Sequence, residues 1–295
     1  MDERFYTLEI NALSSIQHAM KQQAMQSLEA GKVVYFPHYA FIPTAGEQEQ
    51  DILSESILDP KHKNISYDYC SQRLAGVSKQ TSSTSPVMQK FMHRFAEFAH
   101  ELVAHLLPQY QRDLIWGRTS YRPAEIRGRK SSKRKDDTRL HVDAFPSTPV
   151  NGLRIFRVFC NINPYGEPRV WHLGEPFRQV LNKFVATIPP FSATYSRLLK
   201  FIKATKTLRS PYDHYMLHLH DQMKLDDDYQ QSTPKFRFDF PPYSTWLAFT
   251  DHVSHAALSG QFLLEQTFYL PVTAMQHPHL SPLQEWEQEK ACSLV

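Results

Sequence analysis

The stretch RLHVDAFP, residues 139–146, places a histidine and an aspartate two positions apart in a segment of β character. Successive side chains of a β-strand point to opposite faces, so His141 and Asp143 point to the same face. Two such side chains can bind one metal ion. If a second histidine reaches them from elsewhere, the three form a triad that leaves coordination positions of the metal open.

Short runs of β character flank this stretch on both sides. Turn-rich segments such as 146–152 and 163–168 separate them. Closely spaced short strands of this kind are typical of an all-β barrel or sandwich. The predicted strands span residues 32–36, 116–121, 140–145, 154–162, 169–173, 235–240, 245–250 and 262–270.

Helical patterns surround and interrupt the predicted strands. Residues 14–30 read as a helix, and apolar residues recur at helical spacing over 86–107. A helical insertion is predicted at about 175–230, with one helix beginning at the cap and proline of Ser210–Pro211. The segment 45–80 is polar and mixed and gives no prediction.

Length and pattern together predict the architecture. The chain has 295 residues and 41% hydrophobic content, which suffices for one large domain. We expect a single domain over residues 1–295, mainly β, with a β-barrel core, an N-terminal helical region and the helical insertion.

Charge and cysteine usage narrow the class of protein. The formal charge of +3 is too small to indicate nucleic-acid binding. Three widely spaced cysteines form neither a disulfide framework nor a zinc motif, which fits a reducing cytosol. No apolar leader and no run of about 18 apolar residues is seen, so we expect no signal peptide and no membrane-spanning helix.

A basic segment directly precedes the His141 stretch. Such a run is most often a solvated loop. Its position beside His141 instead favours an anionic substrate. The basic residues are Arg127, Arg129, Lys130, Lys133, Arg134, Lys135 and Arg139.

His252 and His255 are the candidates for the second histidine, because both follow the predicted strand 245–250. We prefer His255, which opens the next β segment. With 15 histidines and 30 acidic residues, an H-x-D triplet also arises by chance. The strand setting, the distal histidine and the β-rich chain favour a metal site of the kind found in non-haem Fe(II) oxygenases.

Several long blocks resemble the family of 3-deoxy-D-manno-oct-2-ulosonic acid (Kdo) hydroxylases. They are RLHVDAFPS, RVFCNINP, PRVWHLGEPF and TDHVSHAALSGQFLLEQTFYLP, with GRTSYRPAEIRGR and GKVVYFP, and they cover most of the chain. The resemblance implies a double-stranded β-helix (jelly-roll, cupin-like) core. It also implies Fe(II) held by His141, Asp143 and His255, with 2-oxoglutarate and O2 as cosubstrates. The implied reaction hydroxylates C3 of Kdo on lipid A to give D-glycero-D-talo-oct-2-ulosonic acid (Ko), releasing succinate and CO2.

The C5 carboxylate of 2-oxoglutarate needs a cationic partner, best an arginine. In many members of the wider superfamily an arginine follows the distal histidine, but here Gln261 occupies about that place and offers only a neutral hydrogen bond. Comparison with related hydroxylases places Arg157 inward on the strand 154–162, with Arg154 as the second choice. The alternative is that Arg157 pairs with an internal acid such as Glu265.

Three further residues are expected near the cosubstrate. Tyr121 and Thr119 share one face of their strand, and Asn161 shares a face with Arg157. For Tyr121 the alternative is an ordinary core tyrosine with a hydrogen-bonded hydroxyl.

The resemblance also gives the basic segment a function. Its cations are expected to bind the carboxylates of Kdo and the phosphates of lipid A, and to make peripheral contact with the cytoplasmic face of the inner membrane. The expected substrate-binding residues are Arg127, Arg129, Lys130, Lys133 and Arg134.

Other interpretations stay open. The same fold can act on another anionic glycolipid or sugar acid, or serve as a non-catalytic, cupin-like module that binds lipopolysaccharide. A zinc hydrolase using the same residues would work without O2. The cluster of His214, His218 and His220 lacks the H-E-x-x-H motif, and we expect it to face solvent.

Overall fold

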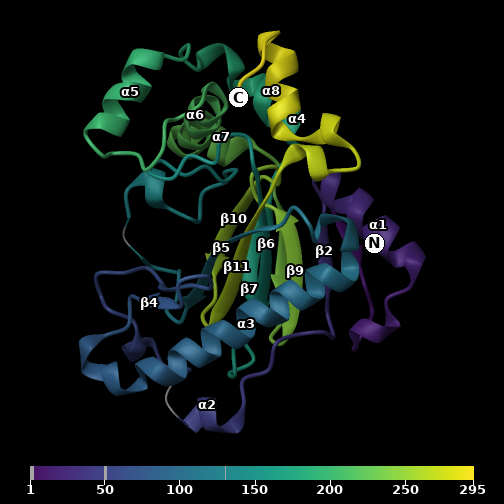
Figure 1. Ribbon diagram of the computed structural model, residues 1–295, viewed down its shortest axis with the longest axis vertical. Helices are drawn as coiled ribbons and strands as arrows, with labels where there is room; N and C mark the ends of the chain where they lie inside the picture. The colour runs from purple at the N-terminus through teal and green to yellow at the C-terminus, as the bar shows by residue number, and fades with distance from the viewer. Residues whose placement is uncertain (1–2, 50–51, 130) are drawn as a thin grey trace.

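Two β-sheets form the centre of the computed structural model, which describes residues 3–49, 52–129 and 131–295 (Figure 1). The larger sheet has the order β1-β2-β9-β6-β11-β5-β3-β4 and the smaller the order β10-β7-β8. The strands are β1 (Phe5–Thr7), β2 (Val33–Phe36), β3 (Ile65–Asp68), β4 (Arg73–Ala75), β5 (Ile115–Arg122), β6 (Arg154–Asn161), β7 (Arg169–Leu173), β8 (Phe236–Phe240), β9 (Ser244–Phe249), β10 (His255–Ser259) and β11 (Leu263–Leu270).

Aromatic side chains fill the space between the two sheets. The Trp246 ring of the larger sheet stacks on Phe240 of the smaller one, with ring centroids 3.9 Å apart. Trp171 packs on Trp246 edge to face at 5.6 Å, and Phe159 stacks on it at 5.3 Å. Large buried rings dominate core energetics, so this cluster fixes the distance between the sheets.

Two helices, α1 (His18–Glu29) and α3 (Ser85–Leu106), cover the outer face of the larger sheet, and α3 crosses its front in Figure 1. Leu102 and Leu106 of α3 pack in one buried cluster with Val158 and Leu247 of the sheet. The predicted amphipathic stripe of α3 is therefore confirmed as core packing. The short helix α2 (Ala45–Glu49) and strands β3 and β4 lie in the segment 45–80, for which no element was predicted.

The helical insertion forms a separate layer at the top of Figure 1, next to the C-terminal helix. Ser210 caps α6 as predicted, since its hydroxyl accepts from the Asp213 amide at 3.1 Å. The Asp213 carboxylate accepts from the Ser210 amide at 3.1 Å in return, which completes a capping box. The helices are α4 (Phe177–Phe184), α5 (Ala193–Phe201), α6 (Pro211–Leu225), α7 (Asp227–Ser232) and α8 (Pro282–Lys290).

The predicted strand 140–145 is wrong except at one residue. His141 alone makes a bridge, to His255. The backbone groups of Leu140 are bonded instead to the side-chain amide of Gln230, with both distances 2.9 Å. A side chain from α7 thus occupies the hydrogen-bonding groups that a longer strand would use.

Within the described residues, no helix is both long and apolar enough to cross a bilayer.

Candidate metal centre and its cavity

The structure brings His141, Asp143 and His255 together, with one ligand atom of each within 4.8 Å of the others. The His141 amide donates to the His255 carbonyl at 3.0 Å, and the His255 amide donates back at 2.9 Å. The Asp143 amide donates to Thr250 O at 2.8 Å, which fixes the third backbone position. The alternative ligand, His252, packs its ring against Phe177 instead, with centroids 5.5 Å apart.

Both histidine rings are oriented to offer Nε2 to a metal. Nδ1 of His141 lies 2.8 Å from the Arg139 carbonyl oxygen, and Nδ1 of His255 lies 2.8 Å from that of Val253. A carbonyl only accepts, so each Nδ1 carries the proton and each Nε2 keeps a free lone pair. Burial lowers the pKa of both rings, which keeps them neutral as metal ligands must be.

Asp143 is held as an anion in the same place. Burial alone would raise its pKa, but the neighbouring Arg157 guanidinium, with other groups, lowers the pKa of Asp143 to about 2. Arg157 Nη2 lies 3.3 Å from Asp143 Oδ2. That oxygen is buried and has no hydrogen-bond partner. Two neutral histidines and an ionised carboxylate with an oxygen that accepts no hydrogen bond fit a divalent metal ion such as Fe(II).

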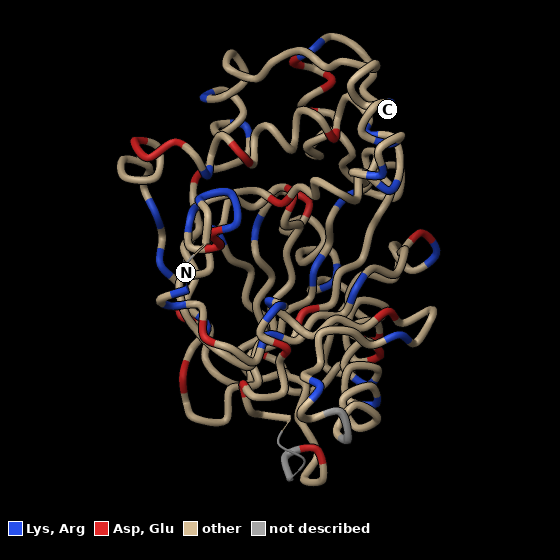
Figure 2. Tube along the Cα trace, turned by 90° about the vertical axis from the view of Figure 1, so that its left-hand side faces the viewer, with Lys and Arg blue, Asp and Glu red and all other residues tan. Residues whose placement is uncertain are grey.

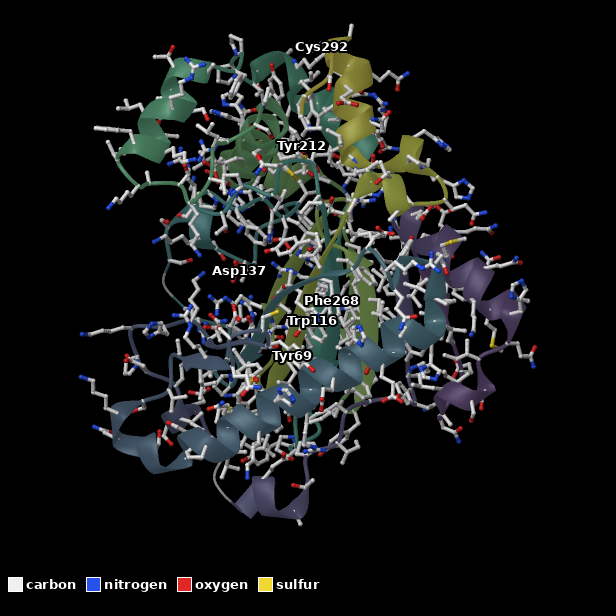
Figure 3. All side chains as sticks on the ribbon, viewed as in Figure 1. Tyr69, Trp116, Asp137, Tyr212, Phe268 and Cys292 are labelled. Atoms are coloured by element: carbon white, nitrogen blue, oxygen red, sulfur yellow. The ribbon has the colours of Figure 1, made fainter. Side chains whose placement is uncertain are left out.

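A cavity of about 420 Å³ opens over these three residues. Among the described residues, six Lys or Arg side chains line it against four Asp or Glu side chains. Asp137, labelled in Figure 3 between the insertion and the strands, lies 3.7 Å from Arg122 Nη1 and 3.6 Å from Lys224 Nζ. The walls thus carry an excess of positive charge, which suits anionic ligands.

Arg157 faces the cavity as predicted, but it is already paired. Its Nη1 lies 3.0 Å from Glu265 Oε1, as the alternative prediction had it, in addition to the contact with Asp143. Arg154 lies on the other face of β6, fully buried, with Nε donating to Asp251 at 2.7 Å. Arg154 therefore does not reach the cavity, and a cation still free to bind a carboxylate has to be found elsewhere.

Arg169 on β7 is that cation, and the sequence did not single it out. It is buried, lines the cavity, and has no carboxylate partner among the described residues. Its Nη1 donates to the Gly260 carbonyl at 2.9 Å, while its buried Nε has no hydrogen-bond partner. Burial lowers the pKa of Arg169 to about 9, which reflects how poorly its charge is compensated. A buried, underpaired guanidinium fits a carboxylate ligand.

The backbone around Gly260 positions Arg169. Gly260 has a positive φ of 118°, and a Cβ there would lie 3.0 Å from Arg169 Cα, so only glycine fits the turn between β10 and β11. The Glu125 carboxylate accepts from the Gly260 amide at 2.8 Å. The turn is therefore fixed from one side by Glu125 and holds Arg169 from the other.

The remaining residues predicted near the cosubstrate do not line the cavity. The Tyr121 hydroxyl donates to Ile52 O at 2.9 Å within the core under α3, so the alternative of a core tyrosine describes it. Thr119 donates to Gln266 at 2.6 Å, and the Asn161 amide donates to backbone carbonyls of Glu167 and Phe240. These three side chains therefore pack in the core and form hydrogen bonds there.

Gln261 also lies outside the cavity, on the turn that follows Gly260. Its side-chain amide donates to Glu55. Gln261 precedes β11, and the residues of β11 that line the cavity are Leu263 and Glu265, so Gln261 is not placed to bind 2-oxoglutarate.

The basic segment lies at the rim of the cavity. Arg134 lines it and donates from Nε to Asp221 at 2.9 Å, and Lys133 lies 2.5 Å from Asp227. Arg127 and Arg129 are exposed and do not line it. Lys130 lies outside the described residues.

Helix α6 supplies wall residues that the sequence interpretation missed. The prediction of solvent-facing histidines is wrong for two of the three, since His214 is buried and His220 lines the cavity. The His220 ring stands edge-on to His141, with centroids 5.4 Å apart. One turn further, Lys224 is buried, and burial lowers its pKa. Their spacing of four residues on one helix face was the available signal.

Two facing sheets, antiparallel apart from the β1–β2 pair, with two histidines and a carboxylate define a jelly-roll protein with a mononuclear metal site of the non-haem Fe(II) oxygenase type. The family model described as "3-deoxy-D-manno-oct-2-ulosonic acid (Kdo) hydroxylase" matches residues 12–291. The chain belongs to this family, whose members are Fe(II)- and 2-oxoglutarate-dependent dioxygenases.

Solved structures of the Kdo hydroxylase KdoO match along nearly the whole chain. The complex with α-ketoglutarate (2-oxoglutarate) and Fe(III) is 43% identical, covers 99% of this chain and 97% of that chain, and has a TM-score of 0.93. The cobalt(II) complex is 44% identical with the same coverage and a TM-score of 0.95. The complex with succinate and Fe(III) is 43% identical with the same coverage and a TM-score of 0.94. No match was found among curated protein sequences. The predicted fold, family and cofactors are confirmed.

Proposed function

We propose that this chain hydroxylates C3 of Kdo carried on lipid A, producing Ko, and works as a single domain at the cytoplasmic face of the inner membrane. The observation that carries the proposal is the triad of His141, Asp143 and His255 under a cavity whose walls are rich in cations. Kdo is a sugar acid, and lipid A adds phosphates, so the substrate is anionic throughout. Family membership supports the choice of Kdo over other sugar acids.

The residues around the triad have distinct roles in this proposal. His141, Asp143 and His255 hold Fe(II), and the bound iron with 2-oxoglutarate supplies the activation of O2. Arg169 binds the C5 carboxylate of 2-oxoglutarate, because it is buried in the cavity wall, its Nε lacks a partner, and it forms no ion pair among the described residues. Arg157 orients Asp143, since it bridges that carboxylate and Glu265.

The opposite wall is assigned to the sugar acid. Lys224, Arg122 and Lys63 converge on Asp137, and this one carboxylate shares its charge among the three cations at 3.6, 3.7 and 3.6 Å. A Kdo carboxylate entering the cavity can bond to cations that Asp137 only partly neutralises. Arg134, at the rim, is placed to meet the next anionic group of the substrate.

The test uses the full chain with Fe(II), 2-oxoglutarate and Kdo-bearing lipid A, mixed without oxygen and then exposed to air. We expect the sugar to gain the mass of one oxygen atom and succinate to form in equal amount. His141→Ala is expected to abolish both. Succinate release that responds to other sugar acids but not to Kdo would move the assignment to another substrate. Binding of the glycolipid without any succinate would indicate a non-catalytic module.

A further inference from the structure

An apolar cluster on and after helix α5 is exposed on the surface of the insertion. The exposed fractions are 84% for Phe201, 58% for Ile202, 53% for Tyr195, 50% for Leu198 and 47% for Leu208. Single exposed apolar residues are ordinary, but a contiguous group of large ones marks an interaction surface.

The cluster forms one face of the helix. At about 100° per residue, Tyr195, Leu198, Phe201 and Ile202 fall within an arc of roughly 120°. Ser196 is the one buried residue of α5, and its hydroxyl donates to the Arg209 carbonyl at 2.7 Å. The helix is therefore attached along the side of Ser196, and its apolar face points away from the protein.

Positive charge dominates the segment around the cluster. From Pro176 to Tyr212 the sequence contains no Asp or Glu and seven Lys or Arg. Figure 2 views the molecule from the side on which α5 lies, with Lys and Arg in blue. The cations are Arg178, Lys183, Arg197, Lys200, Lys203, Lys206 and Arg209. Two of them, Arg178 and Lys183 of α4, pair with Glu285 at 2.9 Å and Glu175 at 2.6 Å, whereas the other five form no ion pair among the described residues. A helix with apolar residues on one face and Lys and Arg beside them is typical of proteins that lie on an anionic bilayer.

The cluster is joined to the rim of the metal cavity. The Lys206 amide donates to the Ser147 carbonyl at 2.9 Å, and Arg209 Nη2 donates to the Pro146 carbonyl at 2.9 Å. Pro146 and Phe145 line the cavity. A surface bound to α5 is thus presented beside the entrance through which a substrate reaches His141.

We propose that α5 and the segment to Leu208 dock on an anionic membrane, inserting their apolar side chains among the lipids and placing the cavity entrance at the level of the headgroups. The link to turnover rests on the function proposed above, whereas docking itself does not. A second copy of the chain is a poorer occupant, because two such faces would bring the five unpaired cations of each copy together without an acid between residues 176 and 212 to pair them.

Vesicle flotation with the full chain tests the docking. The vesicles contain phosphatidylglycerol and phosphatidylcholine without any Kdo lipid. The triple variant Leu198→Ser, Phe201→Ser, Ile202→Ser is compared with Tyr165→Ser, a control that removes a 69% exposed aromatic from the loop between β6 and β7. We expect the triple variant to bind at least tenfold more weakly and the control to bind like the parent chain. Added salt should weaken binding of the parent chain.

Three results would overturn the proposal: equal vesicle binding by the triple variant, no vesicle binding by the parent chain, or a dimer that the triple variant alone fails to form. An unchanged 2-oxoglutarate dissociation constant shows that the triple variant is folded. On Kdo-lipid A in vesicles, we expect its turnover to fall at least tenfold. On the deacylated, water-soluble Kdo glycan, its turnover should match the parent chain. If the parent chain hydroxylates neither, the proposed function fails while flotation still decides the docking.

Discussion

Replacing Arg169 by methionine tests the assignment of the 2-oxoglutarate site. The substitution keeps an unbranched apolar side chain in a buried position and removes the guanidinium. That group makes one hydrogen bond, to the Gly260 carbonyl, and its Nε has no partner. A carboxylate that loses a buried cationic partner loses about 2–5 kcal/mol of binding free energy. At about 1.4 kcal/mol per tenfold, the dissociation constant of 2-oxoglutarate should rise roughly 30- to 5,000-fold.

Stability provides a second, opposite signal. Arg169 is desolvated without a carboxylate partner, so its removal should leave the free energy of unfolding of the ligand-free protein unchanged or higher. Saturating 2-oxoglutarate at about 100 times its dissociation constant should stabilise the parent chain by about 2.7 kcal/mol and the variant hardly at all. A residue with a purely structural role would lower stability instead.

The assay is anaerobic calorimetric titration of the Fe(II)-loaded protein with 2-oxoglutarate, together with thermal unfolding in its presence and absence. Arg118→Met is the matched control, because Arg118 lies on β5 but pairs with Asp68 at 3.4 Å on the surface. A rise of less than threefold in the dissociation constant for Arg169→Met would refute the assignment. A rise for Arg118→Met as large as the rise for Arg169→Met would also refute it.

Three other substitutions test the surroundings of the site. Asp251→Asn leaves Arg154 buried without its 2.7 Å partner and should lower the free energy of unfolding by about 3–5 kcal/mol in urea titrations, whereas the exposed Asp239→Asn should cost less than about 1 kcal/mol. His252 is buried, and burial lowers its pKa to about 3 in the folded protein. As the pH falls, His252 therefore binds a proton in the unfolded chain before it does so in the folded protein, and stability is lost below about pH 6.5. Between pH 7 and pH 5, His252→Gln should therefore lose about 2 kcal/mol less than the parent chain, and equal losses would contradict this. Arg157→Leu should weaken Co(II) binding at least tenfold, measured by titration, because Asp143 loses the 3.3 Å contact that orients it and this loss outweighs the removal of a competing cation. An unchanged or tighter Co(II) affinity would remove Arg157 from its positioning role.

Most strands could be predicted because their residues alternate and turn residues end them. The strand β7 begins and ends where predicted, at Arg169 and Leu173. The short strand β10 was not predicted as a strand of its own, because five residues followed by Gly260, where φ is positive, give a weak pattern. The bridge at His141 was extended into a strand, since nothing in the sequence shows that the Gln230 side chain competes for the backbone.

The candidate ligand triad could be predicted because His141 and Asp143 lie two positions apart and few histidines follow a late strand, although His141 forms only an isolated bridge and not the expected strand. The charged residues that line the cavity could not be predicted in this way. Arg157 and Glu265 meet across β6 and β11, and that pairing depends on a register that alternation alone leaves open. Arg169 was missed because an arginine at the start of a strand usually faces water. The signal was Trp171, two residues on, which shares its face and packs on His255 at 4.9 Å.

The mutual backbone bonds between His141 and His255 have a consequence for biosynthesis. The two histidines are separated along the chain by the entire insertion. A growing polypeptide that has been synthesised as far as α7 therefore contains His141 and Asp143 but not His255. The proposed iron site can form only once β10 has been synthesised and has closed onto His141. Metal loading is therefore a late event in maturation, and any truncated chain that ends before residue 255 leaves the ribosome without a complete iron site.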